Sequence, residues 1–106
     1  MTTQTLLNQL INSVQQHDAR EIHQPDLRQA GVLVAITDEL DPQLVLTRRA
    51  QHLNAHSGEV AFAGGKRDET DPDIVFTALR EAHEEINLCS QQVQVIGPLD
   101  QVVSRF

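Results

Sequence analysis

The stretch from Gly64 to Leu88, GGKRDETDPDIVFTALREAHEEINL, constrains this chain more than any other segment. Its apolar residues recur at steps of four, three and four residues: Val75, Leu79, Ala82 and Ile86. This spacing predicts an amphipathic helix that places these four residues in the core. We expect the helix to begin at Asp71 and Pro72, because Asp caps free amides and Pro tolerates the first helical position. Asn87, which tolerates the left-handed conformation, is expected to end it.

Three glutamates gather near the end of this predicted helix, at Glu81, Glu84 and Glu85. At about 100° per residue they share about one third of the helix circumference, away from the apolar stripe. Glu81 and Glu85 form a like-charge pair, and neither has a cation three or four residues away. A solvated acidic surface is one interpretation of this cluster. The other is a bound divalent cation, because hard carboxylate oxygens suit Mg²⁺ and Mn²⁺.

The glycine pair that precedes the helix fits the same chemistry. Without side chains, Gly64 and Gly65 let the backbone approach an ion or a phosphate closely, and a carbonyl there can complete the ligand shell of a metal. Lys66 and Arg67 follow directly, either as cations that stabilise phosphate or as solvated surface. A metal held in this way can bridge a diphosphate and supply an activated water.

The remaining segments predict one further helix and several strands, which makes the chain an α/β (α+β) protein. The expected elements are a helix over residues 3–16, a surface connection over 17–29, strands over 31–37, 43–48, 58–63 and 92–96, and a loop over 50–57. An acidic turn with a proline separates the first two strands, so we expect them to form an antiparallel hairpin. The third strand should end in the glycine pair.

Two adjacent arginines, Arg48 and Arg49, end the second predicted strand. Solvated surface and a phosphate-facing role are about equally favoured for them, because Arg matches phosphate geometry well. His52 and His56 follow, and on a helix they would share one face, as in some zinc sites. No third ligand has a matching spacing, so we expect a loop here in place of a zinc site.

Composition excludes several classes of protein. With 8 Lys and Arg residues against 15 Asp and Glu residues, the net charge of -7 argues against a nonspecific nucleic-acid binder with a basic surface. Cys89 is the only cysteine, so the chain can form no internal disulfide and no cysteine-based zinc site. No segment approaches the roughly 18 apolar residues that span a bilayer. We therefore expect a soluble, cytoplasmic protein of one domain or less.

Residues 64–88 resemble the signature of the Nudix hydrolases, through Gly65, the run REAHEE at 80–85 and Leu88. Three positions depart from that signature: Asp71 stands in place of Glu, one extra residue precedes Arg80, and Asn87 replaces the terminal glycine. The resemblance implies a Nudix-type α/β/α sandwich around a mixed sheet. It also implies that the later strands and the second large helix of the family are absent from this chain.

On this basis we expect residues 1–106 to form the N-terminal part of a single Nudix domain, truncated at its C-terminus. Residues 1–29 would be an N-terminal helix and connection, and residues 31–106 the Nudix core with its signature at 64–88. The partner implied by the resemblance is a small-molecule nucleoside diphosphate substrate, with no nucleic acid and no membrane. The oligomeric state stays open, and a homodimer is one alternative.

A second motif, upstream, resembles that of the coenzyme A diphosphatase branch of the family: Leu46, Thr47, Ala50, Gly58 and residues 62–65. Ala63 stands where proline is usual, and Asn54 where arginine is usual. The branch hydrolyses coenzyme A and its relatives to phosphopantetheine and 3',5'-ADP, so the resemblance implies a diphosphatase acting on coenzyme A. Two alternatives stay open: a Nudix hydrolase of another substrate, such as ADP-ribose or NADH, and a noncatalytic Nudix-like binding module.

The resemblance also implies roles for individual residues. Glu81 and Glu85 would be the principal ligands of Mg²⁺ or Mn²⁺, with the Gly65 carbonyl as a further candidate. Glu84 would be another ligand or the acid that orients the catalytic water, and Arg80 would orient the glutamates. Candidate contacts to the substrate are Arg48, Arg49, Gly58 and Lys66. The implied reaction is metal-assisted attack of water on a diphosphate, without a covalent enzyme intermediate.

Overall fold

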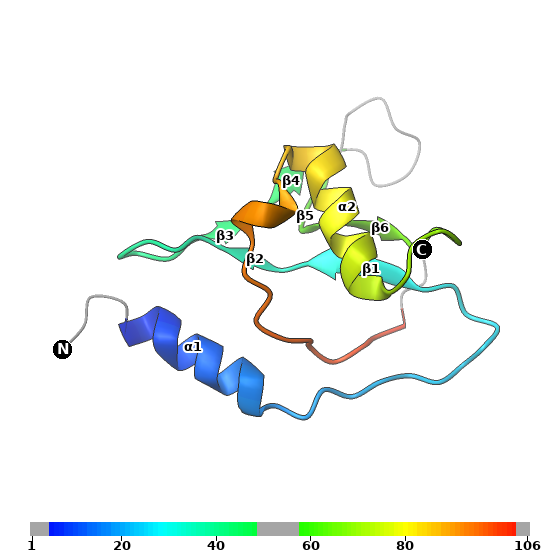
Figure 1. Cartoon of the computed structure of the whole chain (residues 1–106), viewed down its shortest axis with the longest axis horizontal. Coiled ribbons are helices and arrows are strands. Elements are labelled where there is room, and N and C mark those ends of the chain that lie inside the picture. Colours follow the sequence, from blue (N-terminus) through cyan, green and yellow to red (C-terminus); the bar gives the residue numbers. More distant parts are fainter. Residues whose placement is uncertain (1–4, 49–57, 104–106) are drawn as a thin grey trace.

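The structure is a computed structural model that describes residues 5–48 and 58–103. In chain order its elements are the helix α1 (Thr5–Gln16), the strands β1 (Ala30–Leu33), β2 (Ala35–Ile36), β3 (Leu44–Val45), β4 (Thr47–Arg48), β5 (Val60–Ala61) and β6 (Ala63–Lys66), the helix α2 (Ile74–Ile86) and the 3-10 helix η1 (Ser90–Gln92). The strands pair two by two, all antiparallel: β1 with β6, β2 with β3, and β4 with β5. The described part is therefore a mixed structure of two α-helices and short strands, as the sequence predicts (Figure 1).

The helix α2 lies across β1 and β6, and these three elements hold most of the core (Figure 1). Strand pairing places Gly31 of β1 opposite Gly65 of β6. A Cβ atom added to Gly31 would lie 2.8 Å from the carbonyl oxygen of Ile74, so only a glycine lets the helix come this close. The buried side chains at this contact are correspondingly small: Ala63, Thr77, Ala78 and Ala82.

The two ends of α2 confirm one boundary prediction and correct the other. Its N-cap is Asp73, whose side chain accepts a hydrogen bond of 2.8 Å from the amide of Phe76. The predicted start at Asp71 and Pro72 is therefore two residues too early, and the side chain of Asp71 has a different role. Asn87 ends the helix in the left-handed conformation, at φ 56° and ψ 35°, as predicted.

Only part of the predicted apolar stripe of α2 is buried. The buried residues of this helix are Thr77, Ala78 and Ala82. Val75 is 45% exposed, so its predicted place in the core is wrong, while Leu79 and Ile86 are half-buried. The physical reason is the surface that the helix meets. Glycine-lined strands admit the helix at backbone distance, and close packing there favours small side chains over large apolar ones.

The predicted strands form the expected hairpin but are divided differently. The pairing of β2 with β3 confirms the antiparallel hairpin. The strand predicted over 31–37 is split into β1 and β2, which pair with different partners. The strand predicted over 58–63 is also split, and β6 continues through the glycine pair to Lys66. A Cβ atom added to Gly65 would meet the side chain of Glu81 in α2, whereas one added to Gly64 would meet Gly31 and Val32 of β1.

The strand predicted over 92–96 is wrong, because residues 93–103 contain no helix or strand. This segment runs back toward the connection that follows α1 and contacts it through separate bonds (Figure 1). One of them joins His17 Nε2 to Asp100 Oδ1 at 2.7 Å. Bonds to scattered side chains do not make the consecutive backbone ladder that defines a strand.

The predicted N-terminal helix is confirmed as α1. Leu7 is buried on one face of it, and Ile11 and Val14 are half-buried. Val14 lies against the C-terminal segment, since a Cβ atom added to Gly97 would come within 3.2 Å of Val14 Cγ1. One face of α1 therefore packs, as the periodicity predicts. Among the residues that the structure describes, no helix is long and apolar enough to cross a membrane.

Some predictions are not tested by this structure. The loop predicted over 50–57, with His52 and His56, lies outside the described residues, and so does Arg49. The division of the chain at residues 29 to 31 stays a prediction.

Candidate functional site

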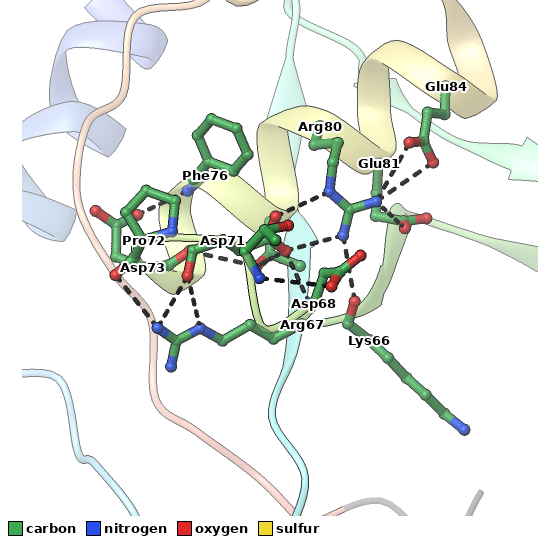
Figure 2. A network of polar contacts seen from close by, with 12 residues as sticks. Lys66, Arg67, Asp68, Asp71, Pro72, Asp73, Phe76, Arg80, Glu81 and Glu84 are labelled. Atoms are coloured by element: carbon green, nitrogen blue, oxygen red, sulfur yellow. Dashed lines mark hydrogen bonds and ion pairs between the residues drawn. The ribbon is translucent and has the colours of Figure 1, made fainter.

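An ion pair between Arg80 of α2 and the buried Asp71 organises the site (Figure 2). Arg80 Nε and Nη2 donate to the two carboxylate oxygens of Asp71, at 3.1 and 2.9 Å. Asp71 is only 2% exposed, and it also accepts hydrogen bonds from the hydroxyl of Thr77 at 2.8 Å and the amide of Asp68 at 2.9 Å. Four donated bonds therefore surround one carboxylate, which offsets the cost of burying its charge.

The charges of this pair stabilise each other. The hydrogen bonds from Arg80 hold the pKa of Asp71 well below its ordinary value of 3.8, and they outweigh burial, which acts in the opposite direction. The bonds to Asp71 raise the pKa of Arg80 above its ordinary value. Asp71 is thus a fixed negative charge that holds a guanidinium in place, not an acid that exchanges protons near neutral pH.

The guanidinium of Arg80 also reaches two of the three glutamates (Figure 2). Its Nη1 donates to Glu81 Oε2 at 3.0 Å and to Glu84 Oε1 at 3.3 Å, while Nη2 donates to the backbone carbonyl of Lys66 at 3.4 Å. Arg80 therefore connects the loop, the end of β6 and the acidic face of α2. Counting only cations three or four residues away, as the sequence analysis does, misses the contact from Arg80 to its direct neighbour Glu81.

The carboxylate of Glu81 lies against the glycine strand. A Cβ atom added to Gly65 would lie 2.6 Å from both Cδ and Oε1 of Glu81. Any side chain at this position would displace the carboxylate, whose side chain is 18% exposed. A glycine at position 65, within a regular strand and opposite Gly31, therefore lets the Glu81 carboxylate lie where it does. The Glu81 carboxylate is therefore in close contact with the backbone of β6.

A surface cleft of about 570 Å³ lies beside this contact. Seven residues singled out from the sequence line it: Gly64, Gly65, Lys66, Arg67, Arg80, Glu81 and Glu85. Three others do not line it: Glu84 is 54% exposed and bonded to Arg80, Arg48 is exposed at the end of β4, and Gly58 has a positive φ of 78°. The cleft thus brings together the glycine strand, the following loop and part of the acidic face of α2.

The oxygen atoms in this cleft suit an ion of the magnesium type. Glu81 and Glu85 line it together with Gly65, and carboxylate and carbonyl oxygens are ligands that Mg²⁺ and Mn²⁺ take, with water completing the shell. Within residues 5–48 and 58–103, no three His, Cys, Asp or Glu side chains gather as a ready-made metal cage. The donor set fits an ion that keeps several waters.

The loop between β6 and α2 is braced by Arg67 (Figure 2). Arg67 Nε and Nη2 donate to the backbone carbonyl of Asp71 at 3.3 and 3.1 Å, and Nη1 donates to the side chain of Gln29 at 2.9 Å. Nη2 also donates to the carbonyl of Pro72 at 3.2 Å. The cation that the sequence allows as a phosphate ligand is therefore occupied inside the protein, where it fixes the backbone that carries Asp71.

Two side chains on which this site depends have roles that were not predicted from the sequence. Asp71 is expected as a helix cap and as the residue in place of the signature's Glu, without a buried ion pair, and Thr77 is not singled out at all. A signal was present in the spacing, because Thr77 and Arg80 are three residues apart and so share a face of the helix. A carboxylate in the loop just before the helix can accept bonds from both.

Most of the chain is similar in sequence to known proteins. A model of the NUDIX domain matches residues 27–105, about three quarters of the chain. A Pectobacterium atrosepticum protein named "Uncharacterized Nudix hydrolase NudL" is 51% identical over 86 residues, which cover 78% of this chain and 44% of that protein. Proteins of the same name from Enterobacter sp. and Salmonella newport are 47% and 41% identical over 77 and 104 residues. These matches cover 73% and 97% of this chain, and 40% and 54% of the two relatives.

The chain spans about half the length of the curated relatives it matches. The matched region nevertheless contains the glycine strand, the loop with its buried Asp71 and the whole of α2 in one continuous stretch. The cleft described above is therefore built from residues inside the match. With a family model that covers well over half of its length, this chain belongs to the Nudix family.

Proposed function

We propose that this protein hydrolyses a diphosphate bond in nucleoside diphosphate derivatives, with coenzyme A as the substrate and Mg²⁺ or Mn²⁺ as the cofactor. The observation that carries the proposal is the cleft in which Glu81 and Glu85 lie beside the Gly65 strand, next to an arginine held by Asp71. The relatives named above are called Nudix hydrolases, and members of that family generally use divalent metals. The choice of coenzyme A rests on the upstream motif alone.

In this proposal each residue of the cleft has a physical task. Glu81 and Glu85 bind the ion, the Gly65 carbonyl contributes one further oxygen, and Glu84 is another ligand or the acid that orients the attacking water. A bound divalent ion neutralises charge on the diphosphate and lowers the pKa of a coordinated water. Arg80 is a positioning residue, because its bonds to Glu81 and Glu84 hold both carboxylates while Asp71 holds Arg80.

The cleft also has a suitable size. Its volume of about 570 Å³ falls within the range of roughly 300 to 1,000 Å³ that small-molecule sites usually occupy. Its lining is dominated by charged residues and glycines, which favours a charged ligand over an apolar one. A nucleoside diphosphate derivative bound through a metal ion meets both conditions.

The substrate is tested by comparing the hydrolysis of three candidates. Coenzyme A, ADP-ribose and NADH are incubated separately with the protein, with and without Mg²⁺, and the products are separated by chromatography. We expect phosphopantetheine and 3',5'-ADP from coenzyme A, only when Mg²⁺ is present. Turnover of ADP-ribose or NADH without turnover of coenzyme A would overturn the substrate but keep the chemistry. No turnover, together with binding of a nucleotide, would favour a noncatalytic module.

The ligand assignment is tested without any substrate. Mn²⁺ binding is measured by calorimetry in the wild type, in Glu85→Gln and in Glu69→Gln, a carboxylate of the same cleft that is not proposed as a ligand. We expect Glu85→Gln to weaken binding by about tenfold or more, because it removes one charged ligand. Glu69→Gln should change it by less than about threefold. Equal affinities in the wild type and Glu85→Gln would contradict the assignment.

A further inference from the structure

Among the described residues, four cations line the cleft, and two of them use most of their donors within the protein. Arg80 bonds to Asp71, to two glutamates and to a backbone carbonyl. Arg67 bonds to the carbonyls of Asp71 and Pro72 and to the side chain of Gln29. These bonds take all five N–H groups of Arg80 and four of the five of Arg67. The positive charges of Arg67 and Arg80 therefore hold the loop and the acidic face of α2 in place.

The other two cations, Arg28 and Lys66, make no side-chain hydrogen bond or ion pair with the described residues. Both are exposed, and both line the cleft. In Figure 2 the side chain of Lys66 extends away from the Arg80 network, although its backbone carbonyl belongs to that network. The carboxylates of Asp68 and Glu69 line the same cleft, yet neither forms an ion pair with these two cations. Two positive charges thus stay available to a ligand.

The fold brings these two residues together from distant parts of the chain. In the ladder of β1 with β6, Ala30 lies opposite Lys66. The pairing is extended by one further bond of 2.9 Å, from the amide of Arg67 to the carbonyl of Gln29. Arg28 therefore precedes β1 at the same end of the sheet at which Lys66 ends β6. This end of the strand pair is fixed by Arg67, which bonds to Gln29 through its side chain as well.

We infer that Arg28 and Lys66 form an anion site that binds phosphate oxygens of the substrate, outside the ligand set of the metal. The inference rests on the proposed function, in which Glu81 and Glu85 hold an ion in the same cleft. The disubstituted diphosphate of such a substrate has four non-bridging oxygens. One ion that keeps several waters contacts only some of them, so the remaining oxygens need other donors. An arginine offers a planar pair of N–H donors and a lysine a compact charge, and both bind phosphate. From the sequence, Arg28 is expected only as part of the surface connection over residues 17–29.

The test measures binding of inorganic pyrophosphate by calorimetry in the absence of divalent ions, so that it does not depend on catalysis. The variants are Arg28→Gln and Lys66→Gln, with Arg20→Gln as the matched control. Arg20 is an exposed arginine of the same connection that does not line the cleft. We expect each cleft variant to weaken pyrophosphate binding by about tenfold, and the control by less than about twofold. Circular dichroism checks that all variants fold alike, and Arg28→Lys should recover part of the affinity.

Two outcomes separate this inference from the proposed function. If Arg28→Gln and Lys66→Gln bind pyrophosphate as tightly as the wild type, or if the wild type binds none, the anion site is overturned even when coenzyme A is hydrolysed. If binding falls as expected while no nucleotide is hydrolysed, the anion site stands and the proposed reaction fails. Where hydrolysis does occur, Arg28→Gln should raise KM by about tenfold and change kcat by less than about threefold, because it removes a binding contact.

Discussion

The two helices of this protein have nearly the same length, 12 residues in α1 and 13 in α2, and both are amphipathic, yet they are held in different ways. Three small residues of α2 are buried against strands that contain glycine at the points of closest approach. Among the residues of α1 whose burial is described, Leu7 alone is buried, and Val14 meets Gly97 through a side-chain methyl group. Amphipathic spacing predicts both helices. The backbone of the surface opposite determines how firmly each is placed.

The polar contacts of the two regions also differ in burial, and those near α2 are the more buried. Asp71 is 2% exposed and accepts four hydrogen bonds from its neighbours, whereas Asp100 has a side chain that is 45% exposed. The pKa of Asp100 is also lowered, by the amide of Arg20 first and by His17 second. One carboxylate is enclosed and holds the positioning arginine of the site. The other ties the C-terminal segment to the connection after α1 at the surface.

The largest expected effect comes from removing the enclosed charge. In Asp71→Asn, Arg80 loses its carboxylate, and the amide group of asparagine faces donors where it should meet acceptors. We expect the Tm to fall by roughly 10 °C or more, with loss of the proposed hydrolase activity. Calorimetric scanning measures this effect. Asp68→Asn, an exposed acid of the same loop, is the matched control and should change the Tm by less than about 3 °C. Equal Tm values for the two variants would show that the buried pair is not what distinguishes this region.

Acid should weaken the same interaction without a mutation. Because the folded-state pKa of Asp71 lies well below 3.8, its ionised form stabilises the fold above about pH 4, and this contribution is lost as the pH falls toward the folded-state pKa. We expect the Tm of the wild type to fall steeply between about pH 5 and pH 2. The Tm of Asp71→Asn should fall less across this window. That of Asp100→Asn should fall nearly as much as the wild type, because the exposed contacts of Asp100 contribute little. Parallel curves for the wild type and Asp71→Asn would contradict the assignment.

A pair of glycine variants compares the packing of the two regions directly. In Gly31→Ala the new Cβ atom would lie 2.8 Å from a backbone oxygen of α2 and 2.9 Å from a backbone nitrogen, neither of which can move alone. We expect a loss of about 1 to 3 kcal/mol in the free energy of unfolding, measured by urea titration. In Gly97→Ala the nearest atom is a methyl carbon of Val14, at 3.2 Å, so the loss should stay below about 0.5 kcal/mol. Similar losses would mean that both helices are held equally closely.

Features that depend on local patterns could be predicted from the sequence. The spacing of apolar residues predicts both helices, and the preference of Asn87 for the left-handed conformation predicts the end of α2. The turn composition between two apolar runs predicts the hairpin of β2 and β3. The glycine pair and the acidic residues near it also emerge from the sequence, and the cleft brings Gly65, Glu81 and Glu85 together.

Features that depend on distant partners could not be predicted in this way. Which face of α2 is buried depends on the glycine-lined surface that it meets, and hydrophobicity alone favours Val75 over Thr77. From its position before the helix, Asp71 is expected to be an ordinary cap. Only the fold brings Arg80 and Thr77 within hydrogen-bond distance of its carboxylate. Residues 92–96 have the composition of a strand, but their neighbourhood supplies no ladder. Arg28 belongs to the site only through the pairing of β1 with β6.

The smallest expected effect lies in the contact between the connection and the C-terminal segment. His17→Gln removes the 2.7 Å contact to Asp100 Oδ1, which keeps its bond from the amide of Arg20. Because the contact is exposed, the Tm should change by less than about 3 °C. The local effect should be larger than the global one. The amide of Gln101, which donates to the carbonyl of Arg20, should exchange its hydrogen several-fold faster.

Hydrogen exchange followed by NMR measures this local loosening, and His23→Gln is the matched control. His23 belongs to the same connection and lies 3.7 Å from Glu21 in a pair that is largely exposed. We expect His23→Gln to leave the exchange of the Gln101 amide unchanged, because its contact does not reach the C-terminal segment. If His17→Gln lowered the Tm as much as Gly31→Ala, the exposed contact would hold its region as firmly as backbone packing holds α2. The contrast between the two regions would then lie in their sequence patterns and not in their stability.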